Sequence, residues 1–154
     1  MLVGAPVAKA AGMEQDRITG SPGSDPVRAV LVVDDDEDSR RILMYGLGSA
    51  GYRVLFAENG AAAVELCRTI RPDLVIMDLA MPEMDGFAAT KVLKSDDRTR
   101  DVPVVAWSAR VFNADTKELL DAGFDEVLAK PALPADVVEL VRRRVPLGSA
   151  PRAD

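Results

Sequence analysis

Short apolar runs rich in β-branched residues alternate with helical patterns five times in this chain. The predicted strands are Ala29–Val33, Arg53–Ala57, Leu74–Met77, Val104–Trp107 and Glu126–Leu128. Such an alternation implies right-handed crossover connections, which place the strands in one parallel sheet with helices on both faces. The sequence therefore predicts an α/β fold with three layers.

Helices are predicted between and after these strands, and local signals indicate where they begin and end. Asn59 is a plausible N-cap, Pro72 excludes helix just before it, Gly123 fits a C-terminal position, and Pro134 fits a first turn. The predicted helical ranges are about 39–49, 60–71, 87–94, 113–122 and from 134 onward. In the last helix, residues 133, 137, 140 and 141 have the spacing of a core-facing stripe.

Size and composition favour a single soluble domain. The chain has 154 residues, of which 48% are hydrophobic and 29% are charged. No apolar run approaches the length of a membrane span, and no convincing secretory signal is present, so we expect a cytoplasmic protein with no membrane contact. Residues 1–26 and 146–154 are expected to be a flexible leader and tail around a folded domain over 27–145.

Charge and missing residue types exclude several kinds of chemistry. The net charge of −6 disfavours direct nucleic-acid binding, and the basic run at 142–144 fits the C-terminus of a helix. The single cysteine, Cys67, has no partner for an internal disulfide. Because the chain contains no histidine, any phosphohistidine in its chemistry belongs to a partner.

Polar side chains stand at the ends of four predicted strands. Asp34 and Asp35 follow the first, Asp78 the third, Ser108 the fourth and Lys130 the fifth. The carboxyl ends of parallel strands meet at one edge of the sheet, so these groups are expected to share a crevice. Crowded carboxylates either take up protons or bind a cation, and hard oxygen ligands suit Mg²⁺.

Each of these residues also has a plainer interpretation. The acidic run after the first strand is typical of a solvated turn that caps a helix, a role we expect for Asp38 or Ser39. A strand-end serine is usually a cap or turn residue, and an isolated lysine is usually solvated. In contrast, Asp78 ends a rigid apolar strand, where a carboxylate can act as a nucleophile toward phosphorus.

Taken in order, the strand-end motifs resemble those of the receiver domain of two-component response regulators. The matching segments are Val32-Val33-Asp34-Asp35, Met77-Asp78, Met81-Pro82-Glu83-Met84-Asp85-Gly86, Ser108-Ala109 and Lys130-Pro131. The resemblance covers 27–145 and implies a flavodoxin-like (βα)5 sandwich with a parallel sheet of order 2-1-3-4-5.

The resemblance also implies roles for individual residues. Asp78 would accept a phosphoryl group from the phosphohistidine of a sensor histidine kinase or histidine phosphotransfer protein. The ligands of Mg²⁺ would be Asp34, Asp35, Asp78 and the backbone carbonyl of Ala80, and Lys130 and Ser108 would hold the phosphoryl group. Such a protein is a signalling switch with a downstream protein target rather than a turnover enzyme, and we expect it to be a stand-alone receiver.

Two positions depart from or qualify this pattern. Receiver domains often carry Tyr or Phe three residues before the lysine, where this chain has Val127, so a constitutive protein-binding module stays an alternative. Ala80 occupies the position at which aspartyl-nucleophile phosphatases of the haloacid dehalogenase type carry a second Asp, which disfavours a hydrolase.

Two further details concern residues next to the predicted site. For Trp107, packing at the strand end is the favoured role. Whether the Lys130–Pro131 bond is cis stays open.

Overall fold

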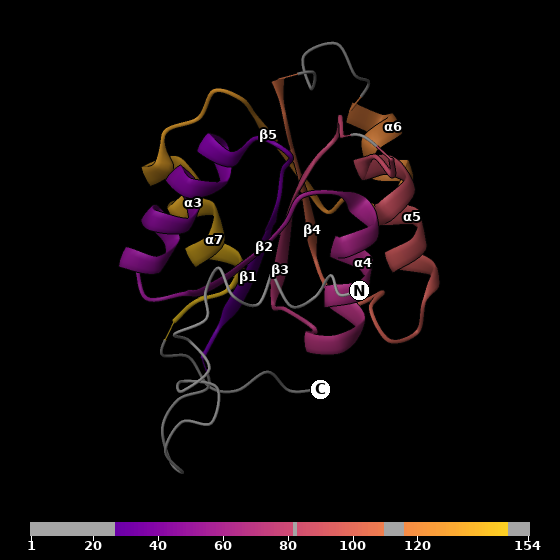
Figure 1. The fold of residues 1–154 in the computed structure, drawn as a ribbon, viewed down its shortest axis with the longest axis horizontal. Coiled ribbons are helices and arrows are strands. Elements are labelled where there is room, and N and C mark those ends of the chain that lie inside the picture. Colours follow the sequence, from indigo (N-terminus) through magenta and orange to yellow (C-terminus); the bar gives the residue numbers. More distant parts are fainter. Residues whose placement is uncertain (1–26, 82, 110–115, 148–154) are drawn as a thin grey trace.

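The computed structural model describes residues 27–81, 83–109 and 116–147, and these residues form a sheet with helices on both sides (Figure 1). The strands are β1 (Ala29–Val33), β2 (Arg53–Ala57), β3 (Leu74–Asp78), β4 (Val104–Ser108) and β5 (Glu126–Ala129). The helices are α3 (Glu37–Ser49), α4 (Gly60–Ile70), α5 (Gly86–Ser95), α6 (Thr116–Asp121) and α7 (Pro134–Arg144).

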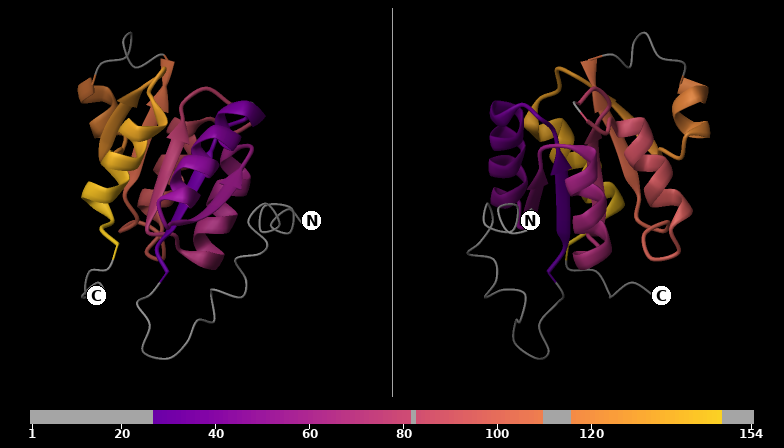
Figure 2. Two further views of the ribbon diagram at one scale, coloured as in Figure 1. Left: turned by 90° about the vertical axis from the view of Figure 1, so that its left-hand side faces the viewer. Right: turned by 45° about the vertical axis from the view of Figure 1, so that its right-hand side comes forward.

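The sheet has the predicted topology. Its strand order is β2-β1-β3-β4-β5, and every neighbouring pair is parallel. Helices α3 and α7 cover one face, while α4, α5 and α6 cover the other (Figures 1 and 2). The chain moves outward in opposite directions from β1 and β3, so the crevice at which α/β folds bind ligands lies between the ends of these two strands.

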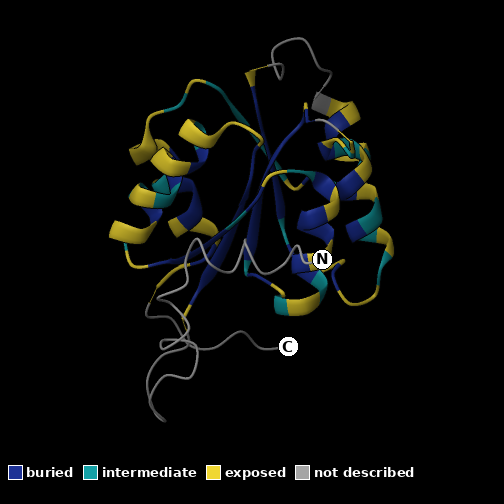
Figure 3. Ribbon diagram, viewed as in Figure 1, coloured by how far each residue is buried: buried dark blue, intermediate teal, exposed yellow. Residues whose placement is uncertain are grey.

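Two hydrophobic clusters hold the layers together, one on each face of the sheet. Along β1, alternate residues belong to different clusters: Leu31 and Val33 pack with α4 and α5, whereas Val30 and Val32 pack with α3 and α7. All residues of β1, β3 and β4 are buried, and Figure 3 shows exposed residues on the outer faces of the helices. The alternation comes from the two-residue period of a strand, which explains why fully apolar runs mark the central strands.

Side-chain caps set the beginnings of three helices. The Asn59 side chain accepts a hydrogen bond from the Ala62 amide, as predicted, and Asp85 caps α5 in the same way. The predicted cap of the first helix was wrong. Helix α3 begins at Glu37, about two residues earlier than predicted, and the Asp36 carboxylate caps it by accepting from the Ser39 amide and hydroxyl at 2.9 and 2.7 Å.

The strand ends also differ slightly from the prediction. β3, β4 and β5 each run one residue further, so Asp78 and Ser108 are the last residues of their strands. Leu133, predicted to face the core, is 67% exposed because it is the N-cap of α7 and precedes the helical spacing. The other members of that predicted stripe, Val137, Leu140 and Val141, are buried.

Parts of the domain prediction lie outside the described residues. These parts are the leader over 1–26, the end of the tail over 148–154 and the start of the helix predicted from residue 113. Val145, the last residue of the predicted domain, is buried against the α3 and α7 side of the sheet. Across 27–81, 83–109 and 116–147, none of the helices combines the length and apolar character required to span a membrane.

Candidate functional site

Asp34 is the most enclosed of the strand-end carboxylates. It directly follows β1, and its side chain has no exposed surface. One oxygen, Oδ1, accepts a hydrogen bond from the Asp36 amide at 2.9 Å. The other, Oδ2, accepts from the indole Nε1 of Trp107 at 3.1 Å and from the Nζ of Lys130 at 2.8 Å. The predicted convergence of strand ends is therefore present between β1, β4 and β5.

Asp78 lies on the neighbouring strand. It is the last residue of β3, is 6% exposed, and stands beside Trp107 in the parallel register of β3 and β4. Its Oδ1 accepts from the Ala80 amide at 3.3 Å, and its Oδ2 lies 3.6 Å from the Nζ of Lys130. The hydrogen bonds and ion pair of Asp78 are therefore longer than those of Asp34. Its Oδ2 is close to the lysine but does not form a short hydrogen bond with it.

Lys130 connects the two carboxylates. Its backbone amide donates to the Ser108 carbonyl at 3.2 Å, which ties the residue after β5 to the end of β4, and the Lys130–Pro131 bond is cis. The side chain is 21% exposed, and its ammonium lies 5.3 Å from the centre of the Trp107 ring. The charge of Lys130 thus lies at the edge of the sheet, nearer to Asp34 than to Asp78.

Three carboxylates form a cluster that could hold a cation. Asp34, Asp35 and Asp78 each offer one oxygen, and these oxygens lie within 4.8 Å of one another. Asp35 is exposed whereas the other two are buried, so the cluster opens to solvent on one side. A set of carboxylate oxygens with an open side matches the preference of Mg²⁺, which keeps several of its waters when it binds protein.

The electrostatics of the cluster centre on Asp78. Burial raises the pKa of this carboxyl to about 6; the positive charge of Lys130 opposes the shift, and the negative charge of Asp34 adds to it. Asp78 is therefore ionised at neutral pH at a cost in free energy. Burial is the main cause of this cost, and the carboxylate crowding that the sequence predicts, here from Asp34, adds to it.

The other two predicted site residues occupy the expected edge of the sheet. Ser108 is buried at the end of β4, and its carbonyl accepts from the Lys130 amide. Ala80 is exposed, and its amide donates to Asp78. The phosphoryl-binding role of the Ser108 hydroxyl and the metal-binding role of the Ala80 carbonyl stay predictions.

Two residues of the site were missed from sequence. The indole of Trp107 contacts the Asp34 carboxylate instead of only packing at the strand end. Arg40 is buried, donates from Nη1 to the Asp34 carbonyl at 2.9 Å, and lies over the Phe56 ring at 4.8 Å. The position of Trp107 beside Ser108 was a usable signal, whereas Arg40 resembles every other charged residue of its helix.

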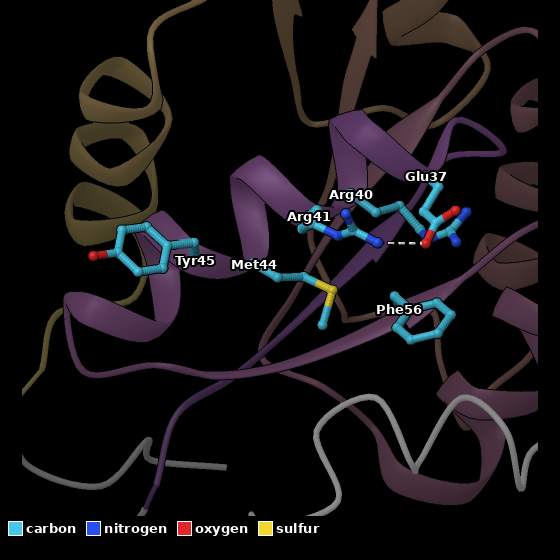
Figure 4. A pocket seen from close by; sticks show the side chains of 6 residues that line it. All are labelled: Glu37, Arg40, Arg41, Met44, Tyr45 and Phe56. Atoms are coloured by element: carbon cyan, nitrogen blue, oxygen red, sulfur yellow. Dashed lines mark hydrogen bonds and ion pairs between the residues drawn. The ribbon is translucent and has the colours of Figure 1, made fainter.

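A surface pocket flanks the site next to α3. It has a volume of about 410 Å³ and is lined by Glu37, Arg40, Arg41, Met44, Tyr45 and Phe56. Figure 4 shows Met44 extending from α3 toward Phe56 of β2, and an ion pair between Arg41 and Glu37. The pocket contains none of the predicted strand-end residues, and its link to the site is Arg40.

Known proteins share both sequence and fold with this chain. The family model for the response regulator receiver domain matches residues 30–142. The polar-differentiation response regulator DivK of Brucella anthropi is 31% identical over 115 residues, which cover 75% of this chain and 94% of that protein. The region matched by the family model includes all five strands except Ala29, the first residue of β1.

Solved structures agree with this result. The chemotaxis protein CheY4 of Vibrio cholerae has a TM-score of 0.71 and 26% identity, covering 77% of this chain and 99% of CheY4. The receiver domain of a sensor histidine kinase from Pseudomonas aeruginosa has a TM-score of 0.71 and 30% identity, covering 77% of this chain and 97% of that domain. That structure has a magnesium ion coordinated in its active site cleft.

Proposed function

The chain belongs to the receiver domain family of response regulators, whose members act as signalling switches, and we propose that it accepts a phosphoryl group on Asp78. The donor is the phosphohistidine of a sensor histidine kinase or of a histidine phosphotransfer protein. The observation that carries this proposal is the convergence of Asp34, Asp35 and Asp78 within 4.8 Å, with the Lys130 ammonium 3.6 Å from Asp78.

The transfer uses the Asp78 carboxylate as the nucleophile. One of its oxygens attacks the phosphorus of the phosphohistidine, the new O–P bond forms as the P–N bond breaks, and the electron pair stays on the leaving imidazole nitrogen. The chain contains no histidine, so this imidazole is the partner's. Asp78 suits the role because it stands at a rigid strand end and is ionised above a pH of about 6.

Mg²⁺ is the proposed cofactor, and the donor set fits it. Asp34, Asp35, Asp78 and the Ala80 carbonyl would hold the ion, since oxygen ligands on an open side of the sheet meet its requirements. When bound, the ion supplies positive charge beside the phosphoryl oxygens and so reduces their repulsion with the Asp78 carboxylate. The magnesium in the related Pseudomonas receiver domain supports this assignment.

Lys130 and Ser108 would bind the transferred group. Lys130 Nζ is 2.8 Å from Asp34 and 3.6 Å from Asp78, so contact with a phosphoryl group on Asp78 requires only a short movement away from Asp34. The Ser108 hydroxyl would donate to a second phosphoryl oxygen from the end of β4. Both residues would respond to the phosphoryl group, whose charge of roughly −2 replaces the single negative charge of the Asp78 carboxylate.

The experiment that tests the acceptor is labelling with radioactive acetyl phosphate in the presence of Mg²⁺. We expect label on the wild-type protein and on Asp85→Asn, and only background label on Asp78→Asn. Asp85 is a matched control because it lies in the same loop and caps α5, a role that Asn fills as well as Asp. Full labelling of Asp78→Asn would contradict the proposal.

The output is proposed to be phosphorylation-dependent binding to a downstream protein. Val127 is half-buried on β5 and packs against the core on the α4 and α5 side, in the position at which receiver domains often have an aromatic side chain. Because Val127 stands in place of this aromatic side chain, a second function is also considered: a module that binds its partner constitutively, whether or not it is phosphorylated. Binding of an isolated partner with and without beryllofluoride distinguishes them, because only a switch changes its affinity.

A further inference from the structure

The Asp34 carboxylate is bound by a residue that the proposed transfer does not use. Trp107 donates its indole N–H to Asp34 Oδ2 at 3.1 Å, and Lys130 donates to the same oxygen at 2.8 Å. We propose that Trp107 is a positioning residue: it holds the Asp34 carboxylate in its metal-binding orientation and keeps a donor on Oδ2 when Lys130 moves toward the phosphoryl group. This inference rests on the proposed function.

The indole is rigidly placed. Trp107 is 5% exposed and lies on β4, where it stands opposite Asp78 of β3 on one side and Leu128 of β5 on the other. Its ring belongs to the hydrophobic cluster under α3 and α7. Because the strand and the packing fix the ring, the direction of its N–H toward Asp34 is built into the fold.

The donors of Asp34 show why a second one on Oδ2 matters. A buried carboxylate requires hydrogen-bond partners on its oxygens, and the partner of Oδ1 is the backbone amide of Asp36. Without Trp107, departure of Lys130 would remove the side-chain donor from Oδ2. The lysine would then be held on Asp34 more strongly, and its movement toward a phosphoryl group on Asp78 would be less favourable.

The ring of Trp107 also contacts Lys130. The ammonium lies 5.3 Å from the ring centre, a distance at which an aromatic face attracts a cation. The same side chain therefore binds Asp34 through its edge and Lys130 through its face. This double contact goes beyond the filling of space at a strand end.

The first test uses the indole as its own reporter. Trp107 is the only tryptophan in the chain, so the ¹⁵N-labelled protein has a single indole N–H resonance. In metal-free protein, we expect this resonance to shift upfield and exchange faster with solvent in Asp34→Asn, but not in Asp35→Asn. An indole resonance in Asp34→Asn identical to that of the wild type would overturn the inference.

The second test removes only the donor. Incorporation of benzothienylalanine at position 107 keeps the shape of the ring and replaces the N–H with sulfur, while Trp107→Phe serves as a second variant. We expect the Kd for Mg²⁺, measured by calorimetry, to rise about tenfold, as for other groups that orient metal ligands. Labelling at subsaturating Mg²⁺ should slow with it. Saturating Mg²⁺ should restore only part of the rate, because Lys130 still leaves Asp34 less readily when the indole donor is absent.

The outcomes separate the two proposals. If the wild type binds Mg²⁺ and is labelled, and the folded benzothienylalanine protein has the same Kd, the positioning role is wrong while the proposed function stands. If the wild type binds no Mg²⁺ and takes no label, the proposed function fails and the positioning role fails with it. Circular dichroism and urea titration of each variant establish that the comparison is made on folded protein.

Discussion

At the scale of single residues, the ionised form of Asp78 is energetically unfavourable in the folded protein. Its carboxyl is buried beside Asp34, and Lys130 offsets only part of the penalty, so the pKa rises from 3.8 to about 6. A raised pKa in the folded state means that the native protein binds a proton more tightly than the unfolded chain. Ionisation of Asp78 therefore destabilises the fold at neutral pH.

We predict that Asp78→Asn stabilises the metal-free protein at pH 7.5, by on the order of 2 kcal/mol. The stabilisation is complete above a pH of about 6, the pKa in the folded state, and declines as the pH falls toward the unfolded value of 3.8. Urea denaturation of both proteins at pH 7.5 and 4.5 measures the change. Asp85→Asn, on an exposed cap, is expected to show little effect at either pH. A gain that does not depend on pH would contradict the electrostatic explanation.

Lys130 should control the titration of Asp78. We predict that Lys130→Met raises the pKa of Asp78 above its wild-type value of about 6, because the positive charge that favours the ionised carboxyl is lost. Carboxyl ¹³C chemical shifts followed against pH in metal-free protein measure this directly. Lys117→Met removes an exposed lysine paired with Asp121 and should leave the Asp78 titration unchanged. If the titration midpoint of Asp78 were the same in Lys130→Met and the wild type, the Lys130 ammonium would be too well solvated to lower the pKa of Asp78.

At the scale of elements, the loop after β3 depends on close backbone contact with α4. The Gly60 amide donates to the Met84 carbonyl at 3.1 Å, and a Cβ at Gly60 would lie 2.5 Å from that oxygen. A side chain at this position would have to displace the loop that follows Asp78. The small residue at the start of α4 therefore fixes the position of the loop.

We predict opposite effects of two glycine-to-alanine substitutions. Gly60→Ala should destabilise the protein, because its Cβ meets backbone, whereas Gly48→Ala on α3 should stabilise it by about 0.5–1 kcal/mol through helix propensity. At Gly48 an added Cβ meets nothing within 4 Å. Urea midpoints of the two variants measure the difference. If both substitutions stabilised the protein, the loop after β3 would be able to move away from position 60 without a loss of stability.

The same scale shows which structural details a sequence can reveal. The parallel sheet and its polar strand ends were predictable, because apolar runs mark buried parallel strands and Asp34, Asp78 and Ser108 stand where such runs stop. The strand order was predicted from the resemblance to receiver domains, and the structure confirms it. The cap of α3 was not, since Asp36, Asp38 and Ser39 are all good caps and only the start of the helix selects one. Leu133 was wrongly predicted to face the core because the helical spacing was extended to a residue that precedes the first turn of α7.

The side-chain contacts inside the site could also not be predicted from the sequence. That Lys130 prefers Asp34 to Asp78, at 2.8 against 3.6 Å, depends on differences smaller than one residue step along a strand. The indole contact of Trp107 with Asp34 joins residues 73 positions apart and needs the sheet order and register together. Sequence pattern located the edge of the sheet on which these residues meet, and side-chain packing decided their partners.

At the scale of the whole molecule, folding brings together charges that the unfolded chain keeps apart. Asp34, Asp35 and Asp78 meet at the end of the sheet with one ammonium, that of Lys130, in contact with two of them. The repulsion is present only in the native state, so a cation that binds the cluster stabilises the native state over the unfolded chain. Under the proposed function, binding of Mg²⁺ and the free energy of unfolding are therefore linked.

We predict that Mg²⁺ raises the free energy of unfolding by about 2.7 kcal/mol when its concentration is 100 times its Kd. Urea titrations at a series of Mg²⁺ concentrations, with NaCl holding the ionic strength constant, measure the gain apart from screening. The matched variant is Asp35→Asn, which removes the exposed carboxylate of the cluster and leaves the buried contacts of Asp34 in place. Because the remaining carboxylates bind the ion more weakly, its titration curve should move to higher Mg²⁺ concentrations. An equal response in both proteins would place the cation somewhere other than the strand-end cluster.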